Sequence, residues 1–350
     1  MSYLHRPFAR PSCACAGVSV HVRDMTEATP GMRRVPLVYV GGTGRGGSTL
    51  LSAVLGMLPQ MVSVGELRGI WGAIQLNELC GCGEQLGDCP FWTEVGQRAF
   101  GGWDGVDVGA ARRADESLCR HRSLPLLVSP TLPASKQMAL EEHLRRLERL
   151  YLAIHDVAGA ESVILDSTKD APYALLLRKV GAIEMRVIHL IRDSRAVAFS
   201  WARRVPRPEY VHIEELRHSS MNVLGPARAA IEWDVRHALF TALAATGSPS
   251  YRLSYESFAE APADWMSSLA RWFGWKVDGH VLDALRSSEY ESEPHHTVGG
   301  NRIRFRRGSV PIRVDDAWLA GMTARERLLV TALTAPLLKR YGYSLRPGAS

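Results

Sequence analysis

Residues 35–49 read VPLVYVGGTGRGGST, and the fold prediction starts from them. The first seven residues form a short apolar, β-branched run, which is typical of a buried parallel strand. From Ser48 to Leu58 the apolar residues recur at helical spacing. The glycines between strand and helix let backbone N–H groups approach an anion at the helix N-terminus. The sequence therefore predicts an anion-binding loop here.

The same alternation of strand and helix continues along the chain. Strands are predicted over 61–64, the start of 162–170 (SVILDSTKD), the start of 185–193 (MRVIHLIRD) and 250–254. Helices are predicted over 135–158, 194–204, 222–246, 262–273 and 325–341. This order indicates an α/β fold with a parallel sheet flanked by helices. Ligands of such sheets bind beyond the carboxyl ends of the strands, where GGTGRGGST, DSTKD and RDSR converge.

Three segments define the predicted domain organisation. Residues 1–34 lack periodicity and are predicted to form a flexible N-terminal tail. Residues 35–345 are predicted to form a single domain. Within it, the pattern weakens over 71–132, where glycines, prolines and cysteines predict an irregular or helical insertion over the site.

Composition excludes several classes of protein. The 350 residues are 46% hydrophobic and 22% charged, and no apolar run approaches the ~20 residues of a membrane span. The N-terminus lacks the apolar core of a secretory signal, and six cysteines are too few for a disulfide scaffold, so a cytoplasmic location is expected. The net charge of +6 is too scattered for nucleic-acid binding. Five arginines within 302–313 do suit a phosphate-rich small ligand.

The glycine-rich loop by itself leaves three interpretations open. Its glycines fit the dinucleotide-binding G-x-G-x-x-G pattern, and Glu66 falls about 20 residues further on. They also fit a Walker A loop with Thr49 at the magnesium-ligand position, but Ser48 replaces the lysine. The third interpretation is a modified P-loop in which Arg45 supplies the cation.

A second motif separates these interpretations. Arg192 ends a predicted strand, and Ser200 lies eight residues later on the following helix. An arginine and a hydroxyl at such a position suit a second phosphate that is not contiguous with the first. Dehydrogenases and kinases do not require this pair, whereas a nucleotide with separate 5′ and 3′ phosphates does.

With these motifs the chain resembles the sulfotransferases that use 3′-phosphoadenosine 5′-phosphosulfate (PAPS), over roughly residues 36–306. Residues 45–50 (RGGSTL) resemble their 5′-phosphosulfate loop, and residues 192–200 resemble their 3′-phosphate motif. Residues 252–262 resemble the segment near the adenine, although Ser254 and Ser257 depart from its pattern. Residues 299–305 (GGNRIRF) resemble a late element of the bacterial members.

The resemblance implies a P-loop-like sulfotransferase fold and a set of donor-binding residues. These are Arg45, Gly46, Gly47, Ser48, Thr49, Leu50, Arg192, Ser200, Tyr255, Asn301 and Arg302. The implied reaction moves a sulfuryl group from PAPS to a hydroxyl or amine of a small-molecule, glycan or lipid acceptor and leaves 3′-phosphoadenosine 5′-phosphate (PAP). The 71–132 insertion would then shape the acceptor site. A small-molecule kinase and a non-catalytic nucleotide-binding protein are the alternatives.

No metal cofactor is expected. A singly charged sulfuryl group needs less neutralisation than a triphosphate, so Arg45 and the loop amides suffice. The missing Walker lysine opposes the kinase alternative, which would require magnesium.

Glu66 is the predicted general base, because it follows a strand and should face the loop. It resembles the glutamate with this role in several sulfotransferases. An ion pair between Glu66 and Arg68 is the alternative. His295 and His296 are then the substitute candidates for the base, and the alternative for both is a loop histidine with satisfied hydrogen bonds.

Lys169 and Arg45 complete the predicted catalytic residues. Lys169 stands at a strand end, resembles a lysine of the family's S-S-K segment, and is expected to contact the transferring group. The alternative is a solvated surface lysine.

The cysteines at 80, 82 and 89 form a C-x-C-x₆-C pattern whose role stays open between a structural staple, a disulfide and a zinc site. Similar segments of cysteine and tryptophan accompany bacterial sulfotransferases, which favours the staple. A zinc site needs a fourth ligand, which Cys13 or Cys15 would have to supply.

Overall fold

The computed structural model of the chain describes residues 33–129 and 132–346. The described residues from Arg34 onward form one compact unit. Most of the predicted tail 1–34, together with Cys13 and Cys15, lies outside the described residues.

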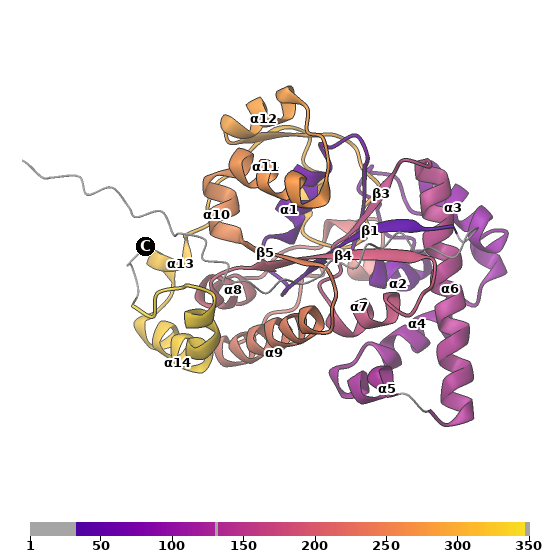
Figure 1. Ribbon diagram of the computed structural model, residues 1–350, viewed down its shortest axis with the longest axis horizontal. Coiled ribbons are helices and arrows are strands. Elements are labelled where there is room, and N and C mark those ends of the chain that lie inside the picture. The colour runs from indigo at the N-terminus through magenta and orange to yellow at the C-terminus, as the bar shows by residue number, and fades with distance from the viewer. Residues whose placement is uncertain (1–32, 130–131, 347–350) are drawn as a thin grey trace, which may run out of the picture. The chain divides into compact units, whose positions relative to one another are not determined.

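A five-stranded sheet organises this unit, with the strand order β2-β3-β1-β4-β5 (Figure 1). The strands are β1 Val35–Gly41, β2 Met61–Gly65, β3 Val163–Asp166, β4 Ile183–Ile191 and β5 Ser250–Ser254. Every neighbouring pair is parallel. The predicted α/β fold with a parallel sheet and flanking helices is confirmed.

Successive side chains of β1 point to opposite faces of the sheet, and each face has its own apolar layer. Leu37 and Tyr39 pack on one side, and Val38 and Val40 pack on the other. Helices α6 (Ala134–Ala158), α7 (Ala171–Leu177) and α9 (Pro226–Ala245) cover the first face. Helices α1 (Ser48–Leu55), α10 (Tyr255–Glu260), α11 (Pro262–Phe273) and α12 (Gly279–Arg286) cover the second (Figure 1).

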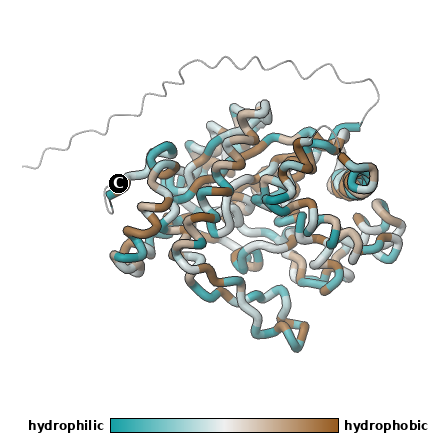
Figure 2. The backbone as a smooth tube through the Cα atoms, turned by 90° about the horizontal axis from the view of Figure 1, so that it is seen from below, coloured by the Kyte–Doolittle hydropathy of each residue, from teal (hydrophilic) through white to brown (hydrophobic). Residues whose placement is uncertain are grey.

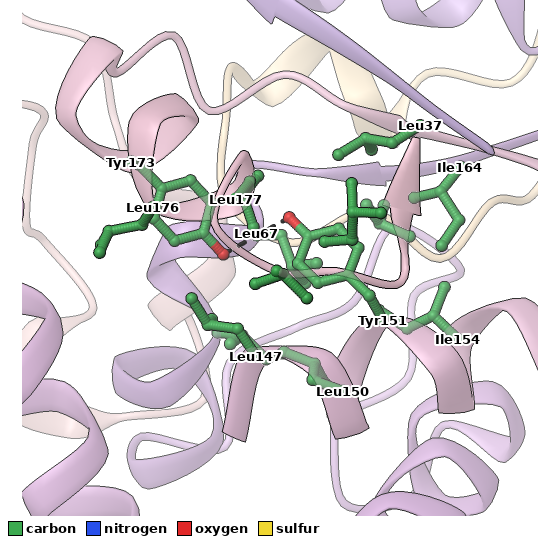
Figure 3. Packing of buried hydrophobic residues seen from close by; sticks show 14 of the residues in the cluster. Leu37, Leu67, Leu147, Leu150, Tyr151, Ile154, Ile164, Tyr173, Leu176 and Leu177 are labelled. Carbon is green, nitrogen blue, oxygen red and sulfur yellow. Dashed lines mark hydrogen bonds between the residues drawn. The ribbon is translucent and has the colours of Figure 1, made fainter. Parts of the chain in front are cut away.

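Helix α6 carries the apolar stripe that closes the first layer (Figure 3). Its Tyr151 lies beside Leu37 and Tyr173, and the two tyrosine hydroxyl oxygens are 3.4 Å apart. The Tyr151 hydroxyl also donates to the Asp166 carboxylate at 2.6 Å. Burial raises the pKa of Asp166 to about 6, against hydrogen bonds from Thr168 and Tyr151 that lower it.

The 71–132 insertion is mostly helical. It holds the end of α2 (Ile70–Gln75), α3 (Pro90–Phe100), α4 (Val108–Leu118) and α5 (Leu124–Val128). Helices α3 and α4 pack on α6 (Figure 1). The irregular part is the loop 76–89 between α2 and α3, which contains three of the cysteines.

The remaining helices and strands follow β4 or β5 in the chain. They are α8 (Ser194–Trp201), the antiparallel pair β6 (Glu289–Ser292) and β7 (Gly308–Pro311), α13 (Trp318–Gly321) and α14 (Ala324–Arg340). Single 3₁₀ turns span Leu67–Gly69, Trp103–Gly105, His121–Ser123, Pro208–Tyr210, Glu214–Leu216 and Arg302–Phe305. Hydrophobic and hydrophilic residues interleave along the helices (Figure 2). Within the described ranges, no helix combines the length and the hydrophobicity that crossing a bilayer demands.

Candidate functional site

Each strand of the large sheet places one candidate group at the same edge, because all five strands run parallel. The loop 42–47 follows β1, Glu66 follows β2, Lys169 lies three residues beyond β3, Arg192 follows β4 and Tyr255 follows β5. Residues far apart in the sequence are thus brought to one edge, as the strand-end argument predicts.

Two side chains, Trp201 and Arg192, hold the backbone of the loop 42–47 by hydrogen bonds. The Trp201 indole N–H donates to the Gly44 carbonyl at 3.1 Å, and Arg192 Nη1 donates to the Arg45 carbonyl at 3.1 Å. Gly47 has φ +94°, and a Cβ atom there would collide with the Tyr255 ring. Only glycine satisfies both conditions.

Helix α1 begins directly after this loop without a side-chain cap, because its N-cap residue is Gly47. The amides of Ser48, Thr49 and Leu50 belong to the first turn, whose N–H groups have no acceptor within a helix. Such free N–H groups are of the kind that bind anions at helix N-termini. Ser48 is buried, while Thr49 and Leu50 are half-buried.

Arg45 brings a cation into the loop in a left-handed conformation, with φ +66°. Its guanidinium lies 5.3 Å from the centre of the Trp201 ring. Nε and Nη2 are inaccessible to solvent and find no hydrogen-bond partner among the described residues. Burial lowers the pKa of Arg45, and the Glu66 carboxylate counteracts this shift. A half-buried cation with two unpartnered donor nitrogens suits an anionic ligand.

Glu66 and Lys169 form an ion pair, with Lys169 Nζ 2.7 Å from Glu66 Oε1. Lys169 is buried and also donates to the Ser167 carbonyl, whereas the Glu66 side chain is 36% exposed. The alternative pairing with Arg68 is not formed, since Arg68 binds Asp115 and Asp170 instead. The alternative of a solvated Lys169 is excluded by its burial.

Residues 295–301, called the strap below, lie against Glu66 and against Thr49 in the first turn of α1. The Glu66 amide donates to the Val298 carbonyl at 2.7 Å, and the Val298 amide donates to the Val64 carbonyl at 2.9 Å. A Cβ atom on Gly300 would lie 3.6 Å from both Glu66 Oε1 and Thr49 Oγ1. The strap therefore brings the predicted late motif, residues 299–305, next to the start of α1, where the glycine-rich motif ends.

Asn301 and Arg302, the two residues of the motif 299–305 that are predicted to bind the donor, differ in their contacts. The Asn301 amide faces Thr49 Oγ1 at 3.4 Å, and the Asn301 side chain caps the following 3₁₀ turn. Arg302 is exposed. The basic segment 302–313 also serves the protein itself, because Arg304 is buried and donates to the Leu79 and Thr297 carbonyls.

Arg192 forms a second cationic centre beside the loop. Its guanidinium carbon lies 4.5 Å from the centre of the Tyr255 ring. Nη2 donates to the Asp315 carbonyl at 2.7 Å and to its carboxylate at 2.9 Å, and Nε finds no partner among the described residues. Ser200 is half-buried in the last turn of α8, and no described residue hydrogen-bonds to its hydroxyl.

A cavity of about 610 Å³ opens at the Glu66–Lys169 pair. Its wall carries both signs of charge, with Arg68 paired to Asp170 and Arg236 paired to Glu232. Residues of 201–236 line it together with the 71–132 insertion. The sequence prediction named only the insertion, because the link between α8 and α9 has no periodic pattern.

The three cysteines meet His296, which the sequence analysis considered only as an alternative base. Cys89 Sγ lies 3.7 Å from the sulfurs of both Cys80 and Cys82, and 3.3 Å from His296 Nδ1. All three described cysteines of this group are free thiols. His295 instead contacts Thr297 Oγ1 at 2.9 Å, and burial lowers its pKa to about 4.

This chain is similar to known proteins in its three-dimensional structure. No family model matches the chain, and no curated protein sequence matches it. A sulfotransferase domain from the curacin biosynthetic pathway superposes with a TM-score of 0.51 at 15% identity, covering 90% of this chain and all (100%) of that one.

Two further solved structures are similar over most of the chain. The sulfotransferase domain of the Synechococcus PCC 7002 olefin synthase gives a TM-score of 0.47 at 18% identity, covering 91% of this chain and 99% of that one. The sulfotransferase STF9 from Mycobacterium avium gives 0.45 at 14% identity, covering 91% and 79%. The curacin-pathway superposition, together with the parallel five-stranded sheet, establishes that this chain has the fold of a sulfotransferase domain.

Proposed function

We propose that the protein transfers a sulfuryl group from PAPS to a hydroxyl or amine of a polar small molecule. The observation that carries this proposal is the presence of two distinct arginine centres at the glycine-rich loop, with Arg45 inside the loop and Arg192 beside it. Arg45 and Arg192 each keep a buried guanidinium nitrogen without a partner among the described residues, and Arg192 donates to the Arg45 carbonyl. A ligand with two separate anionic groups matches this arrangement.

The donor is assigned to the loop and to the ends of β4 and β5. Arg45 and the amides from Gly46 to Leu50 would bind the 5′-phosphosulfate. Arg192 and Ser200 would bind the 3′-phosphate, and Tyr255 would lie against the nucleoside. Asn301, the last residue of the strap, and Arg302, which follows it, would close over the donor.

Catalysis is assigned to Glu66, Lys169 and Arg45. The acceptor oxygen or nitrogen attacks sulfur while the bond from sulfur to the 5′-phosphate oxygen breaks, and that oxygen keeps the electron pair. Glu66 takes the acceptor proton. Lys169 and Arg45 stabilise negative charge on the sulfuryl and leaving-group oxygens.

The acceptor is assigned to the cavity of about 610 Å³. Arginines and carboxylates of its wall, among them Arg68, Arg112 and Glu232, offer charge-assisted hydrogen bonds to hydroxyl groups. A lipid chain would remove water from these charged groups and offer them no hydrogen bonds in return, which is unfavourable. We therefore assign a polyhydroxylated acceptor, such as a glycan, in preference to a lipid.

Isothermal titration of the full chain with PAP, ATP and NAD in parallel tests the donor site. We expect PAP to bind most tightly. Arg192→Ala should weaken PAP binding about ten- to hundredfold, since a charge-assisted contact contributes about 1.5–3 kcal/mol. Arg286→Ala is the matched control, because it removes one exposed positive charge from α12. Equal PAP affinity in both variants would contradict the assignment.

The two alternative functions give different results. A kinase would bind ATP with magnesium, and its activity after chelation would return with magnesium. A non-catalytic binding protein would bind PAP and leave PAPS unconsumed in the presence of polyhydroxylated acceptors. Consumption of PAPS without added magnesium supports the proposed transfer.

A further inference from the structure

The cluster of Cys80, Cys82, Cys89 and His296 lies outside the catalytic machinery proposed above. We propose that these four residues hold a structural Zn²⁺ ion. The ion would tie the loop 76–89 to the strap 295–301. This proposal does not depend on the proposed sulfuryl transfer.

The spacing of the four donor atoms matches a tetrahedral zinc site. Zn–S bonds of about 2.3 Å and Zn–N bonds of about 2.0–2.1 Å place two thiolates roughly 3.8 Å apart and a thiolate and an imidazole nitrogen roughly 3.6 Å apart. Cys89 Sγ lies 3.7 Å from both other sulfurs, and His296 Nδ1 lies 3.3 Å from Cys89 Sγ and 4.0 Å from Cys80 Sγ. All four donor atoms lie within 4.8 Å of one another.

The backbone from Cys80 to Gly83 forms a tight turn that packs closely against the strap. The Gly83 amide donates to the Cys80 carbonyl at 2.9 Å, which closes a tight turn around Cys82. Gly83 has φ +102°, and a Cβ atom on Gly81 would collide with the His295 ring. The glycines of C-G-C-G are therefore required for the turn and for its close approach to the strap.

The imidazole of His296 is oriented by the residues that follow Cys89. Phe91 stacks on it with the ring centres 4.7 Å apart and the planes 5° from parallel. The Trp92 indole N–H donates to the His296 carbonyl at 3.0 Å. Groups that orient a ligand histidine are a regular feature of zinc sites.

Charge around the cluster also suits a zinc complex. Three thiolates and one Zn²⁺ carry a net charge of about −1. Arg304 is buried and donates to the carbonyl of Leu79, next to Cys80, and Arg307 donates to the Gly81 carbonyl. Four protein ligands leave no coordination position for substrate, so the ion would be structural.

A disulfide explains the cluster less well. It would join only two of the three sulfurs and would leave the third thiol and His296 without a role. The three thiol sulfurs and the imidazole nitrogen instead converge on one point, with Cys80 and Cys89 buried and Cys82 half-buried.

The test measures the metal content of the full chain and its spectrum after reconstitution with Co²⁺ under reducing conditions. We expect about one zinc per chain and the visible absorption of tetrahedral, thiolate-bound cobalt. His296→Ala and Cys82→Ser should lose this absorption. His295→Ala is the matched control, because its ring contacts Thr297 and lies outside the cluster, so it should keep the metal. Phe91→Ala should weaken zinc affinity about 10–100-fold, since Phe91 orients a ligand.

Several outcomes would overturn the proposal. One is a reduced, folded wild-type chain that neither retains zinc nor gives the cobalt spectrum. A second is a cobalt spectrum that His296→Ala leaves unchanged. A third is a zinc-free chain with two thiols fewer than the six cysteines provide, which would indicate a disulfide. If the ligand variants fail to fold, cobalt titration of the wild-type chain still decides.

Discussion

At the residue scale, Glu66 is the side chain that the proposed chemistry can least replace. Its carboxylate lies at the end of β2, meets Lys169 at 2.7 Å and borders the cavity assigned to the acceptor. Glu66→Gln keeps the shape but cannot accept a proton, so PAP affinity should persist while the rate falls about 10²–10⁴-fold. Glu94→Gln, an exposed change on α3, is the control. A near-normal rate for Glu66→Gln would exclude Glu66 as the base.

A substitution of Lys169 distinguishes binding of the donor nucleotide from transfer of its sulfuryl group. PAP lacks that group, so Lys169→Met should leave PAP affinity unchanged. The rate should fall roughly ten- to hundredfold, because one charge-assisted contact to the transferring group is lost. Methionine keeps most of the length of this buried side chain. Titration with PAP and the initial rate with PAPS measure the two effects, and an equal loss in both would place Lys169 on the nucleotide.

The sequence predicts which residues reach this edge but not which groups they contact. Arg45, Glu66, Lys169 and Arg192 follow strands, and parallel strands end at one edge, so their convergence was predictable. The partners were not, because they depend on loops that carry no periodic pattern. His296 is 207 residues from Cys89 in the chain, and only the path of the strap brings them together.

At the scale of elements, the strands and long helices follow from hydrophobic periodicity. The predicted helix 262–273 matches α11, and the predicted strand 250–254 matches β5. The short pair β6 and β7 was not predicted, because four-residue strands carry too few positions for alternation to stand out. Their pairing sets the path of the chain on both sides of the strap.

Asp315, which follows β7, binds the arginine that is predicted to hold the 3′-phosphate, and its carboxylate would compete with that phosphate. The Asp315 carboxylate, 51% exposed, occupies Arg192 Nη2 at 2.9 Å. A phosphate that bonds to Arg192 Nη2 as well as to the unpartnered Nε would have to displace this carboxylate. Asp315→Asn should therefore tighten PAP binding about 1.5- to 5-fold, taking about 0.2–1 kcal/mol for an ion pair whose carboxylate is solvent-exposed. Titration calorimetry measures this, with Asp316→Asn as the neighbouring control. Weaker binding would show instead that Asp315 orients Arg192 for the ligand.

At the scale of the whole molecule, a buried histidine pair links the sheet to α9 beneath the glycine-rich loop. His189 Nε2 on β4 lies 2.8 Å from His237 Nδ1 on α9. Burial lowers the pKa of His189 to about 3 and the pKa of His237 well below its usual value. Arg252 acts on His189 and Arg236 on His237, and both cations further disfavour protonation.

This pair makes stability depend on pH in a defined direction. Below the unfolded-state pKa of about 6.5, the unfolded chain binds protons that the folded chain does not. The free energy of unfolding should therefore fall as pH decreases, by up to about 1.4 kcal/mol per pH unit for each histidine. Asp166 acts in the opposite direction, because its pKa of about 6 in the folded chain lies above its unfolded value. As the pH falls through about 6, the folded chain binds this proton before the unfolded chain does, and the free energy of unfolding rises. The histidine contribution must consequently be isolated by substitution.

The double variant His189→Gln/His237→Gln removes both titrations while keeping polar side chains that can bond to each other. Urea unfolding at several pH values from about 7.5 to about 4.5 gives the free energy of unfolding of each chain. The wild-type value should fall relative to that of the double variant as pH drops below about 6.5, since only the wild-type unfolded state gains these two protons. His212→Gln/His218→Gln, which changes two exposed histidines, should follow the wild type. Parallel curves for wild type and the buried double variant would mean that the folded chain protonates His189 and His237 as readily as the unfolded chain does.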